Sequence, residues 1–312
     1  MAIEIFRFQY EENAIYGHFV DSLGINPDSV NSPERIPFLP ISAFKTQKVQ
    51  TGNFTPVRIF ESSGTTGENS SRHYIKDLDI YCQSFLQTFE LFYGRPKNWC
   101  IAALLPGYLE RENSSLVYMV TELIKRSGTT RSGFYLNDHE ALYKSLVHNE
   151  MIEQPTLLFG VTFALLDFAE KYKMNLKHTT IIETGGMKGK REEIIREHLH
   201  NILAKAFGVA AIHSEYGMTE LLSQAYSTSE GIFQCPPWMK VFIREMNDPL
   251  TVYDRPGDKK TRTGLINVID VANLFSCSFI ATDDVGVLHE DGFEVIGRSD
   301  LSDTRGCSLL TT

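Results

Sequence analysis

The pattern of apolar and polar positions changes its period repeatedly along the chain. Short apolar runs of the kind found in buried strands lie at residues 100–105, 156–159, 179–183 and 209–212. Segments whose apolar residues recur every three or four positions lie between them, at residues 77–94, 114–128, 163–172 and 194–208. Asp77 and Ser114 stand where helices should begin, and Gly94 and Gly208 where two of them should end. This alternation predicts an α/β fold with a doubly wound, mostly parallel sheet covered by helices on both faces.

The two ends of the sequence have a different pattern. The first forty residues predict a helical segment that ends in a proline-punctuated stretch at residues 33–40. After residue 230, short β-like pieces follow at residues 239–244, 265–270, 278–281, 285–289 and 294–296. We therefore expect an α/β core over residues 1–230, including the helical N-terminal segment, and a smaller β-rich subdomain of the same domain over residues 231–312.

Composition narrows the class of protein. The 312 residues are 42% hydrophobic, which is enough for a large core, and the net charge is −9. An acidic chain argues against nucleic-acid binding, although a local site for an anion can oppose the overall sign. The N-terminus has no signal-peptide pattern, and no apolar run approaches the ~20 residues that span a bilayer. We expect a cytoplasmic protein with no membrane span.

The five cysteines do not form a recognisable metal or disulfide pattern. They are odd in number and widely spaced: Cys82, Cys100, Cys235, Cys277 and Cys307. We expect the first four to be small core residues. Cys307 follows Arg305 and Gly306 near the C-terminus, where an accessible, activated thiol fits better than a buried one.

Residues 61–71 form a loop rich in small polar residues. Nine of its eleven residues are Ser, Thr, Gly or Asn. Gly64 and Gly67 accept positive φ, so the backbone N–H groups can turn inward around an anion. This predicts a phosphate-binding loop; a flexible Ser/Gly loop is the alternative. It is not a P-loop, because no Lys follows Gly67, and Gly189-Lys190 has Thr184 where the first glycine belongs. The chain has no GxGxxG motif either.

Three later segments carry site-like chemistry. Residues 213–220 place Tyr216, Thr219 and Glu220 together: a ring that can stack on a base, a hydroxyl for a phosphate and a carboxylate for Mg²⁺. Residues 280–286 place two carboxylates in an expected turn, and residues 297–300 lead into residues 305–309. Each segment alone is more typical of a turn or an exposed charged stretch than of a site, and Glu220 also suits the start of a helix. The glycine turns at 64–67 and 185–186 should lie beyond the carboxyl ends of strands, where α/β sheets bind ligands.

The order of these segments resembles the adenylate-forming superfamily of acyl-CoA synthetases, luciferases and peptide-synthetase adenylation domains. The likeness covers roughly residues 60–310 and implies the fold of that superfamily's large N-terminal domain. It implies that Ser63, Gly64, Thr65, Thr66 and Gly67 hold the ATP phosphates. It also implies that Gly185 and Gly186 flank the adenine, Tyr216 stacks on it, Thr219 and Glu220 address the phosphate and Mg²⁺, and Asp284 binds the ribose with Arg298 assisting.

Within that superfamily the chain is most similar to the acyl-protein synthetase (LuxE-type) family, which supplies activated fatty acid to a luminescence fatty-acid reductase. Residues 36–45, 60–67, 183–189 and 305–310 carry the likeness. In that family a cysteine near the C-terminus carries the acyl group as a thioester, and Cys307 is the residue in that position. The likeness implies ATP and Mg²⁺ as cofactors and a fatty acid as substrate, with an acyl acceptor or reductase as partner.

Two departures from the wider superfamily matter. Its first loop continues with Pro-Lys, whereas Asn69 and Ser70 follow here, so a cation at the phosphates must come from Arg72 or elsewhere. Only twelve residues follow Asp300, the usual hinge position, so we expect the separate lysine-bearing C-terminal domain to be absent. A conventional CoA ligase is therefore disfavoured, and the acyl-protein synthetases share this shortened end.

The expected function is a two-step ligase reaction. A carboxylate attacks the α-phosphorus of ATP, and the thiolate of Cys307 then takes the acyl group from the adenylate. One alternative is an acyl- or aryl-AMP ligase that passes the acyl group to CoA, carrier pantetheine or a sugar. Another is a nucleotide-binding subunit without ligase activity of its own. The aromatic residues Phe85, Phe89 and Phe92 suit either a core or the wall of an acyl pocket.

Overall fold

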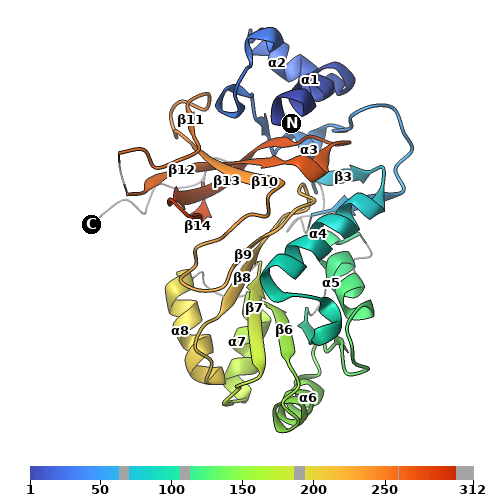
Figure 1. Ribbon diagram of the computed structural model, residues 1–312, viewed down its shortest axis with the longest axis vertical. Coiled ribbons are helices and arrows are strands. Elements are labelled where there is room, and N and C mark those ends of the chain that lie inside the picture. Colours follow the sequence, from blue (N-terminus) through green and yellow to red (C-terminus); the bar gives the residue numbers. More distant parts are fainter. Residues whose placement is uncertain (63–69, 106–112, 186–193, 259, 300–312) are drawn as a thin grey trace.

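The computed structural model describes residues 1–62, 70–105, 113–185, 194–258 and 260–299. A six-stranded sheet forms its lower half (Figure 1). The strand order is β5-β4-β6-β7-β8-β9, and all pairs are parallel except β8–β9. The strands are β4 (Cys100–Leu104), β5 (Gly133–Phe134), β6 (Thr156–Val161), β7 (Thr179–Thr184), β8 (His213–Tyr216) and β9 (Ala225–Ser227).

Helices cover this sheet on two sides, with α4 and α5 on one and α7 and α8 on the other (Figure 1). Their bounds are α4 (Leu78–Tyr93), α5 (Ser115–Lys125), α6 (His139–Met151), α7 (Thr162–Lys171) and α8 (Arg196–Phe207). The caps form as the sequence predicts: Asp77 accepts from the amide of Asp79, and Gly208 adopts a left-handed conformation after α8. The predicted doubly wound α/β arrangement is confirmed. Phe85 and Phe89 are fully buried in its core, and Phe92 packs against them.

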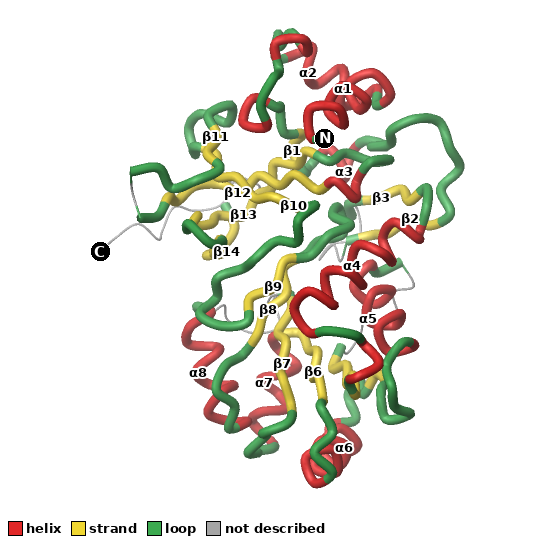
Figure 2. The backbone as a smooth tube through the Cα atoms, in the orientation of Figure 1, coloured by secondary structure: helices red, strands yellow, loops and turns green. Residues whose placement is uncertain are grey.

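A second sheet lies above the first and is mostly antiparallel (Figure 2). Its order is β1-β13-β12-β10-β11, and β14 also pairs with β13. The strands are β1 (Leu39–Pro40), β10 (Met239–Arg244), β11 (Val252–Tyr253), β12 (Arg262–Asp270), β13 (Phe279–Leu288) and β14 (Phe293–Arg298). This is the expected β-rich part of the chain, and the short turn η4 (Val271–Asn273) follows β12.

The N-terminal segment packs on this second sheet. It contains α1 (Ala2–Glu12), α2 (Ala14–Ser22), the 3₁₀ turns η1 (Pro27–Ser29) and η2 (Pro33–Arg35), and α3 (Ala43–Thr46). Phe6 and Tyr16 are fully buried against Phe279 of β13, and β1 adds to the sheet as a parallel partner of β13. The division at residue 230 stays a prediction, but the apolar faces of residues 1–49 belong to the core of the second sheet.

A two-stranded antiparallel ribbon, β2 (Arg58–Glu61) and β3 (Arg72–Ile75), encloses the small-polar loop. The ribbon's last described residues close on one another, because Ser62 and Ser71 exchange backbone and hydroxyl hydrogen bonds of 3.1 and 2.9 Å. Another 3₁₀ turn, η3 (Pro96–Asn98), precedes β4. None of the helices in the described ranges has the length and apolar character needed to cross a bilayer.

Two local predictions were wrong. Residues 209–212 are not a strand; β8 starts at His213, so the polar motif is itself the strand. Residues 280–286 are not a turn, because Thr282, Asp283 and Asp284 continue within β13, whose pairing with β14 shifts register between Val285 and Gly286. In both places polar side chains accept or donate hydrogen bonds within the protein, so a strand forms without an apolar signature.

Candidate active site

The carboxyl end of β8 faces the second sheet, and predicted nucleotide-binding residues meet there. The hydroxyl of Tyr216 donates to Oδ2 of Asp284 at 2.9 Å, and Nε of Arg298 lies 3.2 Å from the other oxygen. Tyr216 and Asp284 are buried, whereas most of the Arg298 side chain is exposed. Side chains from β8, β13 and β14 thus form one cluster of aromatic ring, carboxylate and guanidinium.

Glu220 lies beside this cluster, in the loop after β8 that we call the motif loop (residues 217–223). Its carboxyl group is buried, which raises its pKa, while a hydrogen bond from Ser71 and the charges of Arg298 and Lys45 lower it. Ser71 belongs to the end of the small-polar loop, so Glu220 connects that loop to the strand-end cluster. The charge of Lys45, in α3, also acts on Glu220, and the order of the motifs did not predict this.

Thr219 is held through its backbone. Its carbonyl lies 2.8 Å from Nδ1 of His73, a fully buried residue of β3. The next carbonyl, that of Glu220, accepts from the amide of Asn273 at 2.8 Å. Oδ2 of Asp270 accepts from the backbone amides of Leu222 and Ser223 at 2.8 and 2.9 Å. The motif loop is therefore anchored to both β3 and the second sheet.

Two buried carboxyl groups at the strand ends were not predicted as site residues. Glu183 on β7 accepts hydrogen bonds from the hydroxyls of Thr162 and Ser214, and Glu215 on β8 accepts from Thr184, its cross-strand neighbour. Burial and the charge of nearby Glu183 together raise the pKa of Glu215 to about 7, although the hydrogen bond from Thr184 acts in the opposite direction. Burial also raises the pKa of Glu183. The only sequence signal for this network is the pairing of Thr and Glu on adjacent predicted strand ends.

Glycines shape the two strand ends. Gly185 follows β7 with φ of 70°, is exposed, and its carbonyl accepts from the Thr162 hydroxyl at 2.9 Å. A Cβ at Gly217 would lie 2.4 Å from Oε1 of Glu215, so a larger residue where β8 enters the motif loop would displace that carboxyl group. Both backbone turns thus open at the carboxyl edge of the parallel sheet, as α/β ligand sites do.

Several predicted residues lie outside the described ranges: Ser63, Gly64, Thr65, Thr66, Gly67, Gly186 and Cys307. Their roles stay predictions. Of the described ones, Tyr216, Thr219, Glu220, Asp284 and Arg298 come together, and Gly185 ends the neighbouring strand. Within the described ranges no three His, Cys, Asp or Glu side chains gather as a metal site. The role of Glu220 as a Mg²⁺ ligand stays a prediction; Mg²⁺ commonly takes one or two carboxylates together with nucleotide phosphates.

Comparison with known proteins assigns the whole chain to one family. The sequence profile of the acyl-protein synthetase family, LuxE, matches residues 1–312.

The chain belongs to the acyl-protein synthetase family.

Relatives agree with this assignment. The chain is 22% identical to a long-chain-fatty-acid–luciferin-component ligase of Vibrio harveyi, over 97% of this chain and 84% of the relative. The corresponding ligase of Aliivibrio fischeri is 23% identical, over 98% and 85%. Among solved structures, ATP-bound MatB from Rhodopseudomonas palustris superposes with a TM-score of 0.54 at 18% identity, over 77% of this chain. The chain spans 47% of the length of that structure, so this likeness shows the fold alone.

The family assignment confirms the resemblance and the expectation that this synthetase is a ligase. It also directs attention to thiols. Burial raises the pKa of Cys235 and Cys277 to about 12, and burial raises that of Cys100 as well. Cys82 packs against the core of the parallel sheet, with its sulfur 3.3 Å from the Tyr118 hydroxyl. All four are the small core or near-core residues that the sequence predicts. The raised pKa values make Cys100, Cys235 and Cys277 poor sources of thiolate.

Proposed function

We propose that this synthetase activates a long-chain fatty acid with ATP and carries the acyl group on its own Cys307. The cluster of Tyr216, Asp284 and Arg298 beside Glu220 is the observation that carries the proposal. It offers an aromatic ring, a carboxylate that can accept from ribose hydroxyls, and a second carboxylate for Mg²⁺. Relatives that act on long-chain fatty acids support the choice of substrate.

In the first step the residues of this chain orient ATP and the acid. Asp284 accepts from the ribose hydroxyls, and Gly185 leaves room beside β7 for the adenine. Lys45 and Arg298 supply positive charge near Glu220. Mg²⁺ held by Glu220 would neutralise phosphate charge. A fatty-acid carboxylate oxygen bonds to the α-phosphorus, the bond to the β-phosphate oxygen breaks, and acyl-adenylate and pyrophosphate result.

In the second step the thiolate of Cys307 attacks the carbonyl carbon of the adenylate. The carbon–oxygen bond to AMP breaks, AMP leaves with its electron pair, and a thioester remains on the enzyme. The acyl group then passes to a partner, which we propose to be a fatty-acid reductase or another acyl acceptor. We place this chemistry in the cytoplasm, where thiols stay reduced.

The two steps are separable by experiment. Cys307→Ser should retain ATP–pyrophosphate exchange, because adenylation does not use the thiol. It should carry no hydroxylamine-labile acyl group after incubation with ATP and tetradecanoic acid, because a serine hydroxyl is a poor nucleophile. Intact mass should show one acyl chain on the wild type, mapped to the C-terminal peptide. Cys235→Ser is the matched control and should acylate like the wild type.

Two outcomes would contradict parts of this proposal. An acyl adduct that persists in Cys307→Ser would mean that another residue carries the acyl group or that the group passes to a diffusible acceptor. A wild type without pyrophosphate exchange across a panel of fatty acids would leave a nucleotide-binding subunit as the better description.

A further inference from the structure

His73 is a buried histidine that the two-step reaction does not use. It lies in β3, which leads away from the small-polar loop, and its side chain has no solvent exposure. The ring meets Phe44 of α3 edge-on, with centroids 5.9 Å apart and planes at 83°. Nδ1 lies 2.8 Å from the carbonyl of Thr219 in the motif loop. His73 therefore joins three segments distant in sequence.

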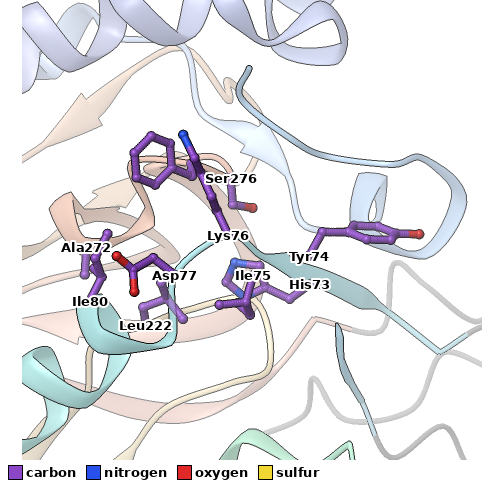
Figure 3. Close-up of a pocket in the computed structure, with 10 residues that line it drawn as sticks. His73, Tyr74, Ile75, Lys76, Asp77, Ile80, Leu222, Ala272 and Ser276 are labelled. Atoms are coloured by element: carbon purple, nitrogen blue, oxygen red, sulfur yellow. The ribbon is translucent and has the colours of Figure 1, made fainter. Parts of the chain in front are cut away.

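The two ring nitrogens have different surroundings. A carbonyl only accepts, so Nδ1 must carry the hydrogen that binds Thr219. Nε2 has no hydrogen-bond partner among the described residues. His73 lines a small pocket together with Lys76 and Ser276 (Figure 3), and Phe275 also contributes to the lining. Nζ of Lys76 sits 3.9 Å above the Phe275 ring centroid. A neutral, Nδ1-protonated imidazole thus makes one directed contact, and that contact is to the motif loop.

The contact adds to others on the same short segment. Asn273 and Asp270 fix the backbone of Glu220, Leu222 and Ser223 from the second sheet. His73 of β3, and Ser71 directly before that strand, fix Thr219 and Glu220 from the other side. Two residues at the start of the same chain segment therefore hold consecutive residues of the motif loop. The strand that ends the small-polar loop and the loop that presents Glu220 cannot move independently while these bonds last.

We propose that His73 is a positioning residue for the Thr219–Glu220 pair, acting through the Thr219 carbonyl so that the motif loop is held against β3 in the arrangement that binds Mg·ATP. The proposal rests on the proposed adenylation function. It assigns His73 no proton transfer and no contact with substrate. Its loss should weaken productive binding of Mg·ATP more than it weakens the fold.

Three substitutions separate the hydrogen bond from packing. His73→Asn places an amide N–H close to the position of Nδ1, His73→Gln places it close to Nε2, and His73→Phe keeps an aromatic ring without a donor. His139→Phe is the matched control, because His139 is a half-buried histidine edge-on to Phe168, away from the motif loop. The measurements are KM for ATP and kcat in pyrophosphate exchange with tetradecanoic acid, and the midpoint of thermal unfolding.

We expect His73→Gln and His73→Phe to raise KM for ATP about 10-fold or more, with thermal midpoints close to that of His73→Asn. His73→Asn should stay within about threefold of the wild type, and His139→Phe should match it. Wild-type kinetics in His73→Phe would overturn the proposal. Equal losses in all three His73 variants would also overturn it, since they would show that packing alone matters.

Hydrogen exchange gives a readout that does not depend on activity. The peptide covering residues 217–223 should exchange about 10-fold faster in His73→Phe than in the wild type, and at wild-type rates in His73→Asn. A wild type without pyrophosphate exchange but with this pattern would refute the adenylation function and leave the anchoring of the loop standing. Unchanged exchange in His73→Phe would refute the anchoring itself.

Discussion

The two sheets present acids to the site in opposite ways. At the edge of the parallel sheet, Glu183 and Glu215 are buried and accept hydrogen bonds from hydroxyls, and burial raises the pKa of both. On the antiparallel sheet, Asp284 is paired with the Arg298 guanidinium and the Tyr216 hydroxyl. The two sheets therefore surround their acids differently: hydroxyl donors face Glu183 and Glu215, whereas a guanidinium faces Asp284.

The sheets also differ in how the chain builds them. Strands β4, β6, β7 and β8 lie side by side in the order in which they follow one another along the chain, and helices join each to the next. The antiparallel sheet combines β1 near the N-terminus with strands from the last third of the chain. The site lies where a locally built sheet meets one that depends on both ends of the sequence.

The largest expected effect tests whether the N-terminal helices depend on the second core. Phe279→Ala removes a fully buried ring that contacts Phe6, Tyr16 and Phe38, and should lower the free energy of unfolding by about 3–5 kcal/mol in urea titrations. It should also expose residues 1–50 to limited proteolysis. Phe168→Ala, in the parallel-sheet core, should cost about as much without that exposure. Equal protease sensitivity in both variants would mean that the two cores open together.

The next prediction separates the two kinds of acid. Glu220→Gln should slow pyrophosphate exchange 10²- to 10³-fold, about 3–4 kcal/mol, because it removes the charge proposed to hold Mg²⁺. Glu215→Gln should stay within about 10-fold of the wild type at pH 7, because an amide preserves the hydrogen bond from Thr184. Similar losses in the two variants would erase the distinction between a carboxyl group near Lys45 and Arg298 and one that is bonded to a hydroxyl.

The same contrast predicts a pH dependence of stability. The pKa of Glu215 is raised from 4.5 to about 7 in the folded protein, so between these values the folded state holds a proton that the unfolded state releases. The free energy of unfolding should therefore fall as pH rises from about 4.5 to about 7, by on the order of 1–3 kcal/mol. Glu215→Gln should show a shallower fall in chemical denaturation at pH 5, 6, 7 and 8. A slope equal to that of the wild type would assign the dependence to other groups.

The smallest expected effect concerns the cation from the N-terminal segment. Lys45→Ala should lower kcat/KM for ATP about 10-fold, ~1.4 kcal/mol, because Lys45 acts electrostatically on Glu220. Lys48→Ala is the matched control, since Lys48 lies over the Tyr74 ring. If both substitutions lower kcat/KM for ATP in pyrophosphate exchange equally, the cause is a general effect of net charge.

Much of the parallel sheet could be predicted from the sequence because its signals are local. Asp77 and Gly94 bound α4 as predicted, and residues 239–244 form β10. Helix α6 escaped prediction, since only three of its residues, Leu142, Leu146 and Asn149, are buried. The pairing of β1 with β13 could not be foreseen, because no local pattern specifies a partner at the far end of the chain.

The residues of the candidate site likewise fall into those that the sequence predicted and those that it did not. The order of the motifs was enough to select Tyr216, Glu220, Asp284 and Arg298, which the structure brings together. It did not reveal the contribution of Lys45 or the anchoring by His73 and Asp270, because these depend on which segments fold against the motif loop. Residues that touch a ligand can leave a sequence signature, whereas those that hold them in place are set by the tertiary structure.

The attachment of the first helix has a consequence for biosynthesis. Gln9 bonds to Ser278, 269 residues later, and to the carbonyls of Asn273 and Leu274. A ribosome adding about 5–20 residues per second needs roughly 15–50 s to make that partner. Throughout that interval the nascent chain carries Phe6 and Tyr16 without the strand that buries them, so this segment is a natural client for chaperones.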